Sequence, residues 1–388
     1  MTLTQLAVTI ALLGALGLVA SRFGLSAIPA YLLAGLLLGP NEPEFLTVVR
    51  PSEVTEFVAE LGVIFLLFFL GLEFPLTRFL GAGRNVMIGG AIDLVANAVL
   101  GLAVGIAAFG FSFGAFVLAA AVYVTSSAVT IKGLTDFRRL ADDETGLVLG
   151  ILLFEDLVIA LVLGFAATGG GTAVGTLSIG SKAVAFVLGS LLVARWLSRV
   201  VDRVLDGLPR EFFLLFVFGL LIGMSATSAA LGLSEAIGAL MAGVIFADTS
   251  ARIEIEERFF SFRDLFGALF FFVFGLTIEL EEIDRVGWLV ALAVALTVVG
   301  KLGGGFAAGR ITGYTPRQSL NVGAALVAHG EFTIILAQVA GGNPKLSGDV
   351  KRDLIAFAGL YVLATATLGV VLMKESRRIG RLLFPVRT

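Results

Sequence analysis

Long apolar runs, separated by short stretches with charges, glycine or proline, follow one another along the whole chain. A run of about 17 to 25 apolar residues is the length at which a helix crosses the hydrocarbon core of a bilayer. The pattern predicts thirteen such spans. They cover residues 3–21, 27–40, 54–74, 85–109, 113–134, 142–168, 176–197, 210–230, 232–249, 261–281, 286–309, 317–340 and 350–374.

The composition also indicates an all-α, multi-pass membrane protein. Apolar residues make up 58% of the 388 residues and charged residues only 15%, which is far outside the range of soluble domains. The chain has no cysteine and one histidine, which argues against thiol chemistry, iron–sulfur clusters and a histidine-based metal site. The net charge of -3 gives no sign of a nucleic-acid partner, and we expect no cofactor.

The loop charges predict the orientation. An odd number of spans places the two termini on opposite sides of the membrane, and twenty Lys and Arg residues fall on the side of the C-terminus against six on the other. Because positively charged loops stay inside, we expect a cytoplasmic C-terminus and an outside N-terminus in the cell (inner) membrane.

Two pairs of segments indicate that the halves of the chain are related. IPAYLLAGLLLG (28–39) aligns with EAIGALMAGVIFA (235–247), and VIFLLFFLGLEF (63–74) aligns with LFFFVFGLTIEL (269–280), at offsets of 208 and 204 residues. If spans one to six recur as spans eight to thirteen, the two six-helix repeats are inverted, as in secondary transporters. Similar apolar composition alone is the alternative explanation.

Polar clusters interrupt two equivalent spans. Thr125, Ser126 and Ser127 lie in span five, and an offset of 204 from Ser126 leads to Gly330 in VAHGEFTII of span twelve. Hydroxyl side chains compete for backbone hydrogen bonds and weaken a helix. Both spans are therefore predicted to be discontinuous, with free carbonyl groups near the membrane midplane. The alternative is that small residues merely allow close helix packing.

Two adjacent acids, Glu155 and Asp156, lie within the apolar run LLFEDLVIAL. Each charge costs roughly 2.5 to 3.5 kcal/mol at the centre of a membrane helix. Successive residues point about 100° apart, so one acid can bind an ion while the other pairs elsewhere. We predict a monovalent cation on Asp156, Thr125 and Ser126, with Ser127 nearby. Desolvation favours the protonated form of such a carboxyl, so a proton can compete with the cation.

Lys301 is the one basic residue that we assign to neither side of the membrane, because it is buried within span eleven, and we expect it to compensate an acid of span six. A purely structural ion pair is the alternative, but it leaves the other acid unpaired. His329 and Glu331 are accessory candidates; their HGEF sequence lacks the HExxH spacing of zinc proteases, and a lone histidine is more often structural. We assign structural roles to three further acids within the spans, Glu60, Asp93 and Glu235.

In order and spacing, several segments resemble the monovalent cation:proton antiporters of the Kef and NapA kind. The resemblance covers nearly the whole chain. It rests on YLLAGLLLGP (31–40), ELGVIFLLFFLGLEF (60–74), TSSA (125–128), FEDL (154–157), LSEAIGALMAGVIFAD (233–248), FRDLFGALFFFVFGL (262–276), GK (300–301) and HGEF (329–332).

The resemblance implies a domain organisation. Spans five and twelve would be crossing, discontinuous helices, and the protein would be a homodimer. A dimerisation domain would take residues 1–84 and 210–284, an ion-transport core residues 85–170 and 285–388, and a linker helix residues 171–209. Kef-type proteins also carry a cytoplasmic nucleotide-binding domain, so a separate or truncated regulatory domain is expected.

The resemblance also assigns residue roles. Asp156 matches the acid that binds ion and proton, Thr125, Ser126 and Ser127 match the unwound segment, and Lys301 matches the basic residue that faces the acids. Glu155 departs from the pattern, since sodium-selective electrogenic members commonly have Asp there and Kef-type members Gln. Likeness to the paired-carboxylate members favours electrogenic exchange, with Glu155 paired to Lys301.

We therefore predict a secondary active transporter, not an enzyme, that exchanges Na⁺ or K⁺ for H⁺ by alternating access and serves pH homeostasis. Two other classes stay open. A gated cation channel would need a continuous pore, and no filter like TVGYG occurs. A sodium-coupled symporter of an organic anion would need Arg or Asn ligands, of which the predicted spans have few.

Overall fold

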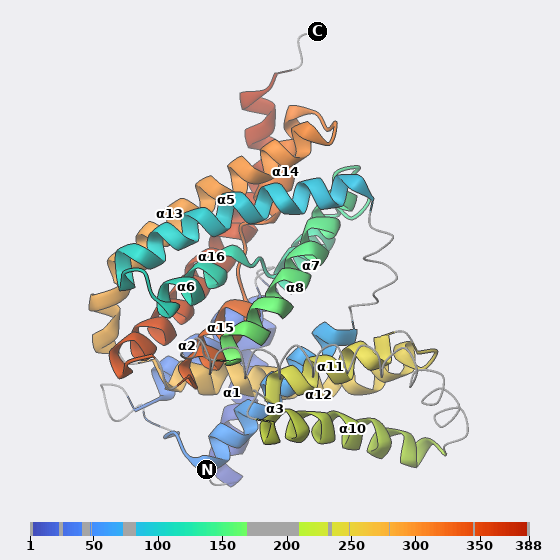
Figure 1. The fold of residues 1–388 in the computed structure, drawn as a ribbon, viewed down its shortest axis with the longest axis vertical. Coiled ribbons are helices and arrows are strands. Elements are labelled where there is room, and N and C mark those ends of the chain that lie inside the picture. The colour runs from blue at the N-terminus through green and yellow to red at the C-terminus, as the bar shows by residue number, and fades with distance from the viewer. Residues whose placement is uncertain are drawn as a thin grey trace.

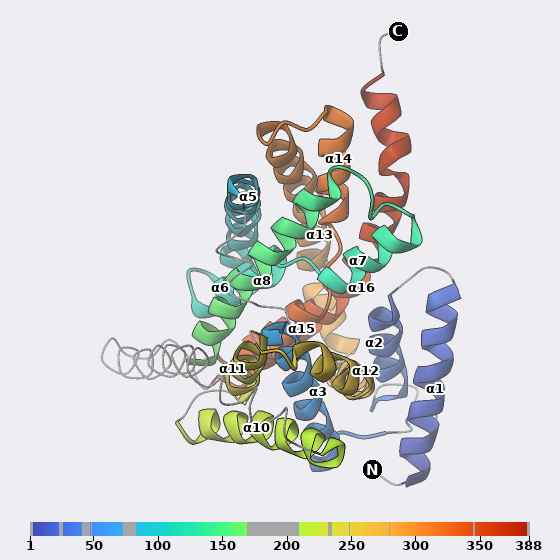
Figure 2. The same ribbon diagram turned by 90° about the vertical axis from the view of Figure 1, so that its right-hand side faces the viewer.

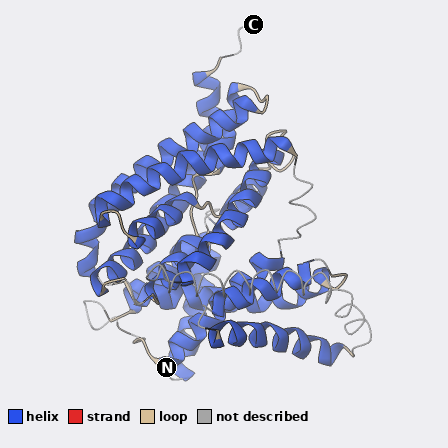
Figure 3. Cartoon of the chain, in the orientation of Figure 1, coloured by secondary structure: helices blue, strands red, loops and turns tan. Residues whose placement is uncertain are grey.

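The computed structural model describes residues 3–22, 26–40, 47, 49–72, 83–168, 209–231, 235–247, 249–278, 280–343 and 346–385. Within these residues all regular structure is helical (Figure 3), which confirms the all-α prediction. The predicted span at 176–197, and with it nearly all of the expected linker, lies outside the described residues.

The helices follow the other predicted spans. In the first half they are α1 (Leu3–Arg22), α2 (Ala27–Leu38), α3 (Glu53–Leu72), α5 (Arg84–Phe109), α6 (Phe113–Tyr123), α7 (Ser127–Asp136) and α8 (Thr145–Thr168). In the second half they are α10 (Arg210–Ala230), α11 (Glu235–Ala247), α12 (Arg252–Leu276), α13 (Leu280–Ile311), α14 (Pro316–Ala325), α15 (Glu331–Gly341) and α16 (Gly348–Leu383). Eight segments of the described chain, with α6 and α7 taken together, are long and apolar enough to cross a membrane.

Two predicted spans were shorter than the helices that the structure shows. Span ten was expected at 261–281, but α12 begins at Arg252, and span thirteen was expected to end at 374, but α16 continues to Leu383. Hydropathy detects only the apolar part of a helix, which faces the lipid. The helix itself continues through polar turns when interactions between side chains stabilise those turns. In α12 an ion pair joins Arg252 to Glu256 one turn later, with 2.7 Å between Nε and Oε1.

The helices form two groups, seen from two directions in Figures 1 and 2. One group contains α1, α2, α3, α10, α11 and α12, and the other contains α5 to α8 and α13 to α16. Each group therefore takes helices from both halves of the chain. This arrangement places α5, α6, α8, α13 and α14 next to one another, and these helices carry most of the intramembrane polar residues.

Close helix contacts recur at equivalent positions in the two halves. A glycine on one helix faces the backbone of its neighbour, so the two axes approach closely. The contacts are Gly101 with Ala119 and Gly105 with Ala115 between α5 and α6, and, 204 residues later at each position, Gly305 with Gly323 and Gly309 with Ser319 between α13 and α14. The offset read from the sequence is therefore a structural repeat.

In the group that contains α2, α3, α11 and α12, close glycine contacts join helices of the two repeats. Gly35 of α2 packs on Gly275 of α12, and Gly71 of α3 packs on Gly243 of α11. In the sequence alignment Gly35 corresponds to Gly243 and Gly71 to Gly275. Each crossing therefore joins a helix of one repeat to a helix of the other.

We expect Gly35→Ala to destabilise the protein by about 1 to 3 kcal/mol, since overpacking forces a well-packed contact apart. A Cβ atom on Gly35 would overlap the carbonyl oxygen of Phe272 and lie 2.8 Å from the Cα of Gly275. Gly14→Ala is the matched control, because a Cβ there meets nothing within 4 Å. Thermal unfolding in detergent compares the two variants; equal melting temperatures would contradict the tight crossing.

Candidate functional site

Both predicted helix interruptions are present. The first lies between Tyr123 and Ser127, where α6 ends and α7 begins, and the second lies between α14 and α15. Ser126 belongs to both features: its Oγ caps α7 by accepting from Val129 N at 3.3 Å, and its own N–H donates to the carbonyl of Ala328 in the other break at 2.8 Å. The two broken helices are thus joined at the point where they are unwound.

Side chains of each broken helix reach the carbonyl oxygens at the end of the other. The pairs are Thr125 Oγ1 with Leu326 O at 2.9 Å, Thr130 Oγ1 with Ala325 O at 2.9 Å, Thr333 Oγ1 with Ala121 O at 2.9 Å, and His329 Nε2 with Val122 O at 2.8 Å. Thr125 and His329 are equivalent under the repeat offset. Three of these carbonyls, which were expected to be free, therefore accept hydrogen bonds from threonine hydroxyls, and the fourth lies against the imidazole ring of His329.

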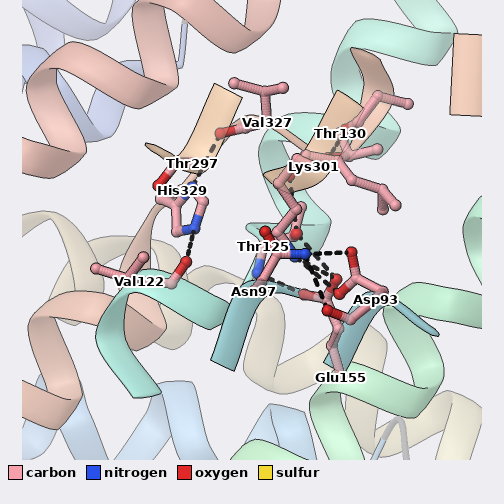
Figure 4. Close-up of polar contacts among 12 residues, drawn as sticks. Asp93, Asn97, Val122, Thr125, Thr130, Glu155, Thr297, Lys301, Val327 and His329 are labelled. Atoms are coloured by element: carbon pink, nitrogen blue, oxygen red, sulfur yellow. Dashed lines mark hydrogen bonds and ion pairs between the residues drawn. The ribbon is translucent and has the colours of Figure 1, made fainter. Parts of the chain in front are cut away.

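A buried charge cluster lies beside the first break (Figure 4). Lys301 Nζ of α13 lies 2.9 Å from Glu155 Oε1 of α8 and 3.0 Å from Asp93 Oδ2 of α5, and all three side chains have 0% exposure. Asn97 Nδ2 donates to Asp93 Oδ1 at 2.9 Å. One ammonium group is therefore shared by two carboxylates.

Glu155 is also tied to the unwound segment. The backbone N–H of Thr125 donates to Glu155 Oε2 at 2.5 Å, and the Thr125 hydroxyl lies 3.0 Å from Oε1. The break at α6 and α7 thus provides an N–H group that a continuous helix would use within itself. A movement of Glu155 is consequently coupled to the geometry of the break.

The sequence interpretation assigned Asp93 a structural role without a partner, and the structure places it against Lys301. A signal for this position was present in the repeat. Asn97 corresponds to Lys301 at the offset of 204, and Asp93 lies one helical turn before Asn97. A polar pair on α5 opposite the basic residue of α13 could have been inferred from that correspondence.

Asp156 points to a different neighbour from Glu155. The hydroxyl of Ser127 lies 3.2 Å from Asp156 Oδ2 and 3.4 Å from Oδ1, and Asp156 retains 7% exposure. Ser127 thus supplies the hydroxyl beside this acid, whereas the predicted ligand Ser126 uses its hydroxyl in the cap of α7. The two adjacent acids therefore occupy separate environments.

His329 is buried, and each of its two ring nitrogens lies within hydrogen-bond distance of a backbone carbonyl oxygen. Its Nδ1 lies 2.9 Å from Val327 O, and the hydroxyl of Tyr361 lies 3.2 Å from Nε2. Tyr361 is held in turn by Thr297, with 2.5 Å between their hydroxyl oxygens. Glu331, the other accessory candidate, is half-buried in the first turn of α15. These contacts fit a structural role for His329 in fastening α15 to α6 and α16.

The chain matches the family described as sodium/hydrogen exchanger, transmembrane, over residues 8–374. It belongs to this family. The exchanger is 38% identical over 374 residues to the K⁺/H⁺ antiporter subunit KhtU of Bacillus subtilis, covering 94% of this chain and 91% of that protein. It is 30% identical over 369 residues to the ammonium/H⁺ antiporter subunit AmhT of Alkalihalophilus pseudofirmus, covering 94% and 90%.

Among solved structures, the fold of the exchanger is similar to that of the sodium proton antiporter MjNhaP1 from Methanocaldococcus jannaschii at pH 8. The TM-score is 0.69 at 17% sequence identity, over 98% of this chain and 99% of the other. The comparisons confirm the predictions of a multi-pass membrane transporter rather than an enzyme, and of cation/proton antiport.

Proposed function

We propose that this exchanger carries K⁺ in one direction and H⁺ in the other, with Asp156 as the group that binds either. The observation that carries the proposal is the position of Asp156: a nearly buried carboxylate faces a hydroxyl group where a membrane helix is broken. Carboxylate and hydroxyl oxygens suit a hard monovalent cation, and the same carboxylate can hold a proton. Binding of one then excludes the other.

The choice of K⁺ over Na⁺ is supported by the relatives. One is named as a K⁺/H⁺ antiporter subunit and the other as an ammonium/H⁺ antiporter subunit, and these two cations are similar in size. Within the family we assign the chain to the Kef-like group. Both relatives are named as subunits, which supports a separate regulatory partner on the cytoplasmic side.

We assign alternating access to movement of the core helices α5 to α8 and α13 to α16 against the other group. The charged residues of the site come from α5, α8 and α13, so the cluster can move as one unit. The glycine crossings of α2 with α12 and α3 with α11 pack the second group closely, and we assign the interface of the homodimer to this group. The N-terminus is outside and the C-terminus cytoplasmic in the inner membrane.

The proposal predicts that the apparent KM for the cation rises as pH falls, while the maximal rate at saturating cation changes little. A protonated Asp156 cannot accept the cation. At pH values at which most copies of Asp156 are protonated, the fraction of protein able to bind the cation therefore falls by about tenfold for each unit by which the pH is lowered. The measurement is proton movement in proteoliposomes with an internal pH dye, for Li⁺, Na⁺, K⁺, Rb⁺ and NH₄⁺ in turn.

K⁺, Rb⁺ and NH₄⁺ should give the largest responses in this assay. A response to Na⁺ and Li⁺ alone would contradict the assignment of the ion. A KM that stays constant with pH would indicate separate sites for cation and proton and would contradict the shared carboxylate.

A further inference from the structure

The charge cluster contains one more acid than its base can neutralise. With all groups ionised, Asp93 and Glu155 contribute two negative charges and Lys301 one positive charge, which leaves one negative charge. Asp156 lies outside this cluster, beside Ser127. Glu155 also accepts a hydrogen bond from the N–H group of Thr125, close to the N-terminal end of α7, and both features stabilise a carboxylate charge.

We propose that Asp93 is a positioning residue that keeps Lys301 protonated throughout the cycle, so that one proton is exchanged for each cation. The proposal rests on the function proposed above. Glu155 precedes Asp156 in α8, and a cation arriving at Asp156 attracts it away from Lys301. A buried ammonium group left without a carboxylate loses its proton readily, but Asp93 stays 3.0 Å from Lys301.

Asp93 is suited to this role because it is fixed. Asn97 holds one of its carboxylate oxygens at 2.9 Å and leaves the other for Lys301. The glycines that flank Lys301 bring α5 and α13 together: a Cβ on Gly300 would collide with Asn97 Oδ1, and one on Gly304 would lie 3.9 Å from the Cα of Asp93. Lys301 Nζ also lies 5.2 Å from the centre of the Tyr123 ring, a contact that favours its charged form.

The charges balance in both loaded states. With a proton on Asp156, the four groups carry one net negative charge, from Asp93, Glu155 and Lys301. With a cation on ionised Asp156, the cation cancels that carboxylate and the net charge is again one negative. The proton that leaves Asp156 is the only one released, so exchange is electroneutral. This differs from the electrogenic exchange that the resemblance favoured, because the resemblance paired Lys301 with Glu155 alone and did not include Asp93.

The test measures the balance point of exchange, which is the pH difference at which net proton movement stops. This pH difference depends on the stoichiometry of exchange and not on the turnover rate. Proteoliposomes containing a pH dye are held at zero membrane potential with equal thiocyanate on both sides, and a tenfold K⁺ gradient is imposed. With one proton per cation a pH difference of about one unit stops net proton movement, and with two protons about half a unit does so.

We expect balance at about one pH unit for the wild-type protein and at about half a unit for Asp93→Asn, in which Lys301 depends on Glu155 alone and gives up its proton when the cation binds. Glu155→Gln should balance at about one unit, because Asp93 still holds Lys301. Asp136→Asn, which removes a half-exposed acid of α7 paired with Lys132, is the control and should balance with the wild type.

Balance at half a unit for the wild type, or at one unit for Asp93→Asn, would overturn the proposal. If Asp93→Asn does not fold, Glu155→Gln decides the question, and a shift of its balance point to half a unit would equally overturn it. Absence of exchange with every cation in the wild type would instead refute the proposed function.

Discussion

Asp156→Asn is expected to reduce cation-dependent proton movement to the level of liposomes without protein. An amide keeps the shape of the side chain but binds no proton at neutral pH and provides no charge for a cation. Ser127, which faces the carboxylate at 3.2 Å, cannot replace it, because a hydroxyl group is neutral. Neither half of the exchange cycle then has a binding group.

The measurement is the dye assay in proteoliposomes, with protein content and melting temperature compared to confirm that the variant is folded. Asp136→Asn is the matched control, since it makes the same chemical change on the half-exposed surface of α7. Retained exchange by a folded Asp156→Asn variant would show that another acid binds the ion and would remove the basis of the proposed function.

Lys301→Met is expected to lower the free energy of unfolding by roughly 3 to 5 kcal/mol, because removing one partner of a buried ion pair leaves an uncompensated charge. Here the change leaves two carboxylates, Asp93 and Glu155, facing a thioether at 0% exposure. Lys132→Met is the control. Its ion pair with Asp136 has side chains 40% and 34% exposed, and such pairs contribute about 0 to 1 kcal/mol.

The triple variant Asp93→Asn, Glu155→Gln, Lys301→Met should melt above Lys301→Met alone, because neutral side chains of similar size replace all three charges. Thermal unfolding in detergent at neutral pH gives the order of stability. Equal melting of Lys301→Met and Lys132→Met would mean that the charges do not meet, and would rule out the role assigned to Asp93.

The position of the helices along the chain could be predicted because a bilayer leaves few alternatives. A spanning segment must satisfy its own backbone hydrogen bonds, so a run of sufficient apolar length becomes a helix. The breaks at Thr125 and His329 could be predicted for a related reason, since clusters of polar and small residues weaken a helix locally. Alignment of the two halves showed that both breaks fall at equivalent positions.

The identity of the residue that faces each acid could not be predicted in the same way. Ser126 and Ser127 are adjacent and chemically identical, yet one caps α7 and the other faces Asp156. The difference is a rotation of about 100° around the helix axis. That rotation is set by where the unwound segment ends, which depends on hydrogen bonds to the other broken helix.

The sequence by itself determined the apolar spans, the two breaks, the inverted repeat and the presence of a buried acidic pair with one lysine. The repeat places Asn97 opposite Lys301, but only the tertiary structure showed that Asp93, 208 residues from Lys301 in an ordinary apolar run, makes the contact with its ammonium group. Its contact depends on how closely α5 crosses α13, and that distance is set by glycines on α13 packing against α5 side chains. Hydrophobic periodicity reports which face of a helix is buried, but the crossing of two helices depends on the shapes of both surfaces.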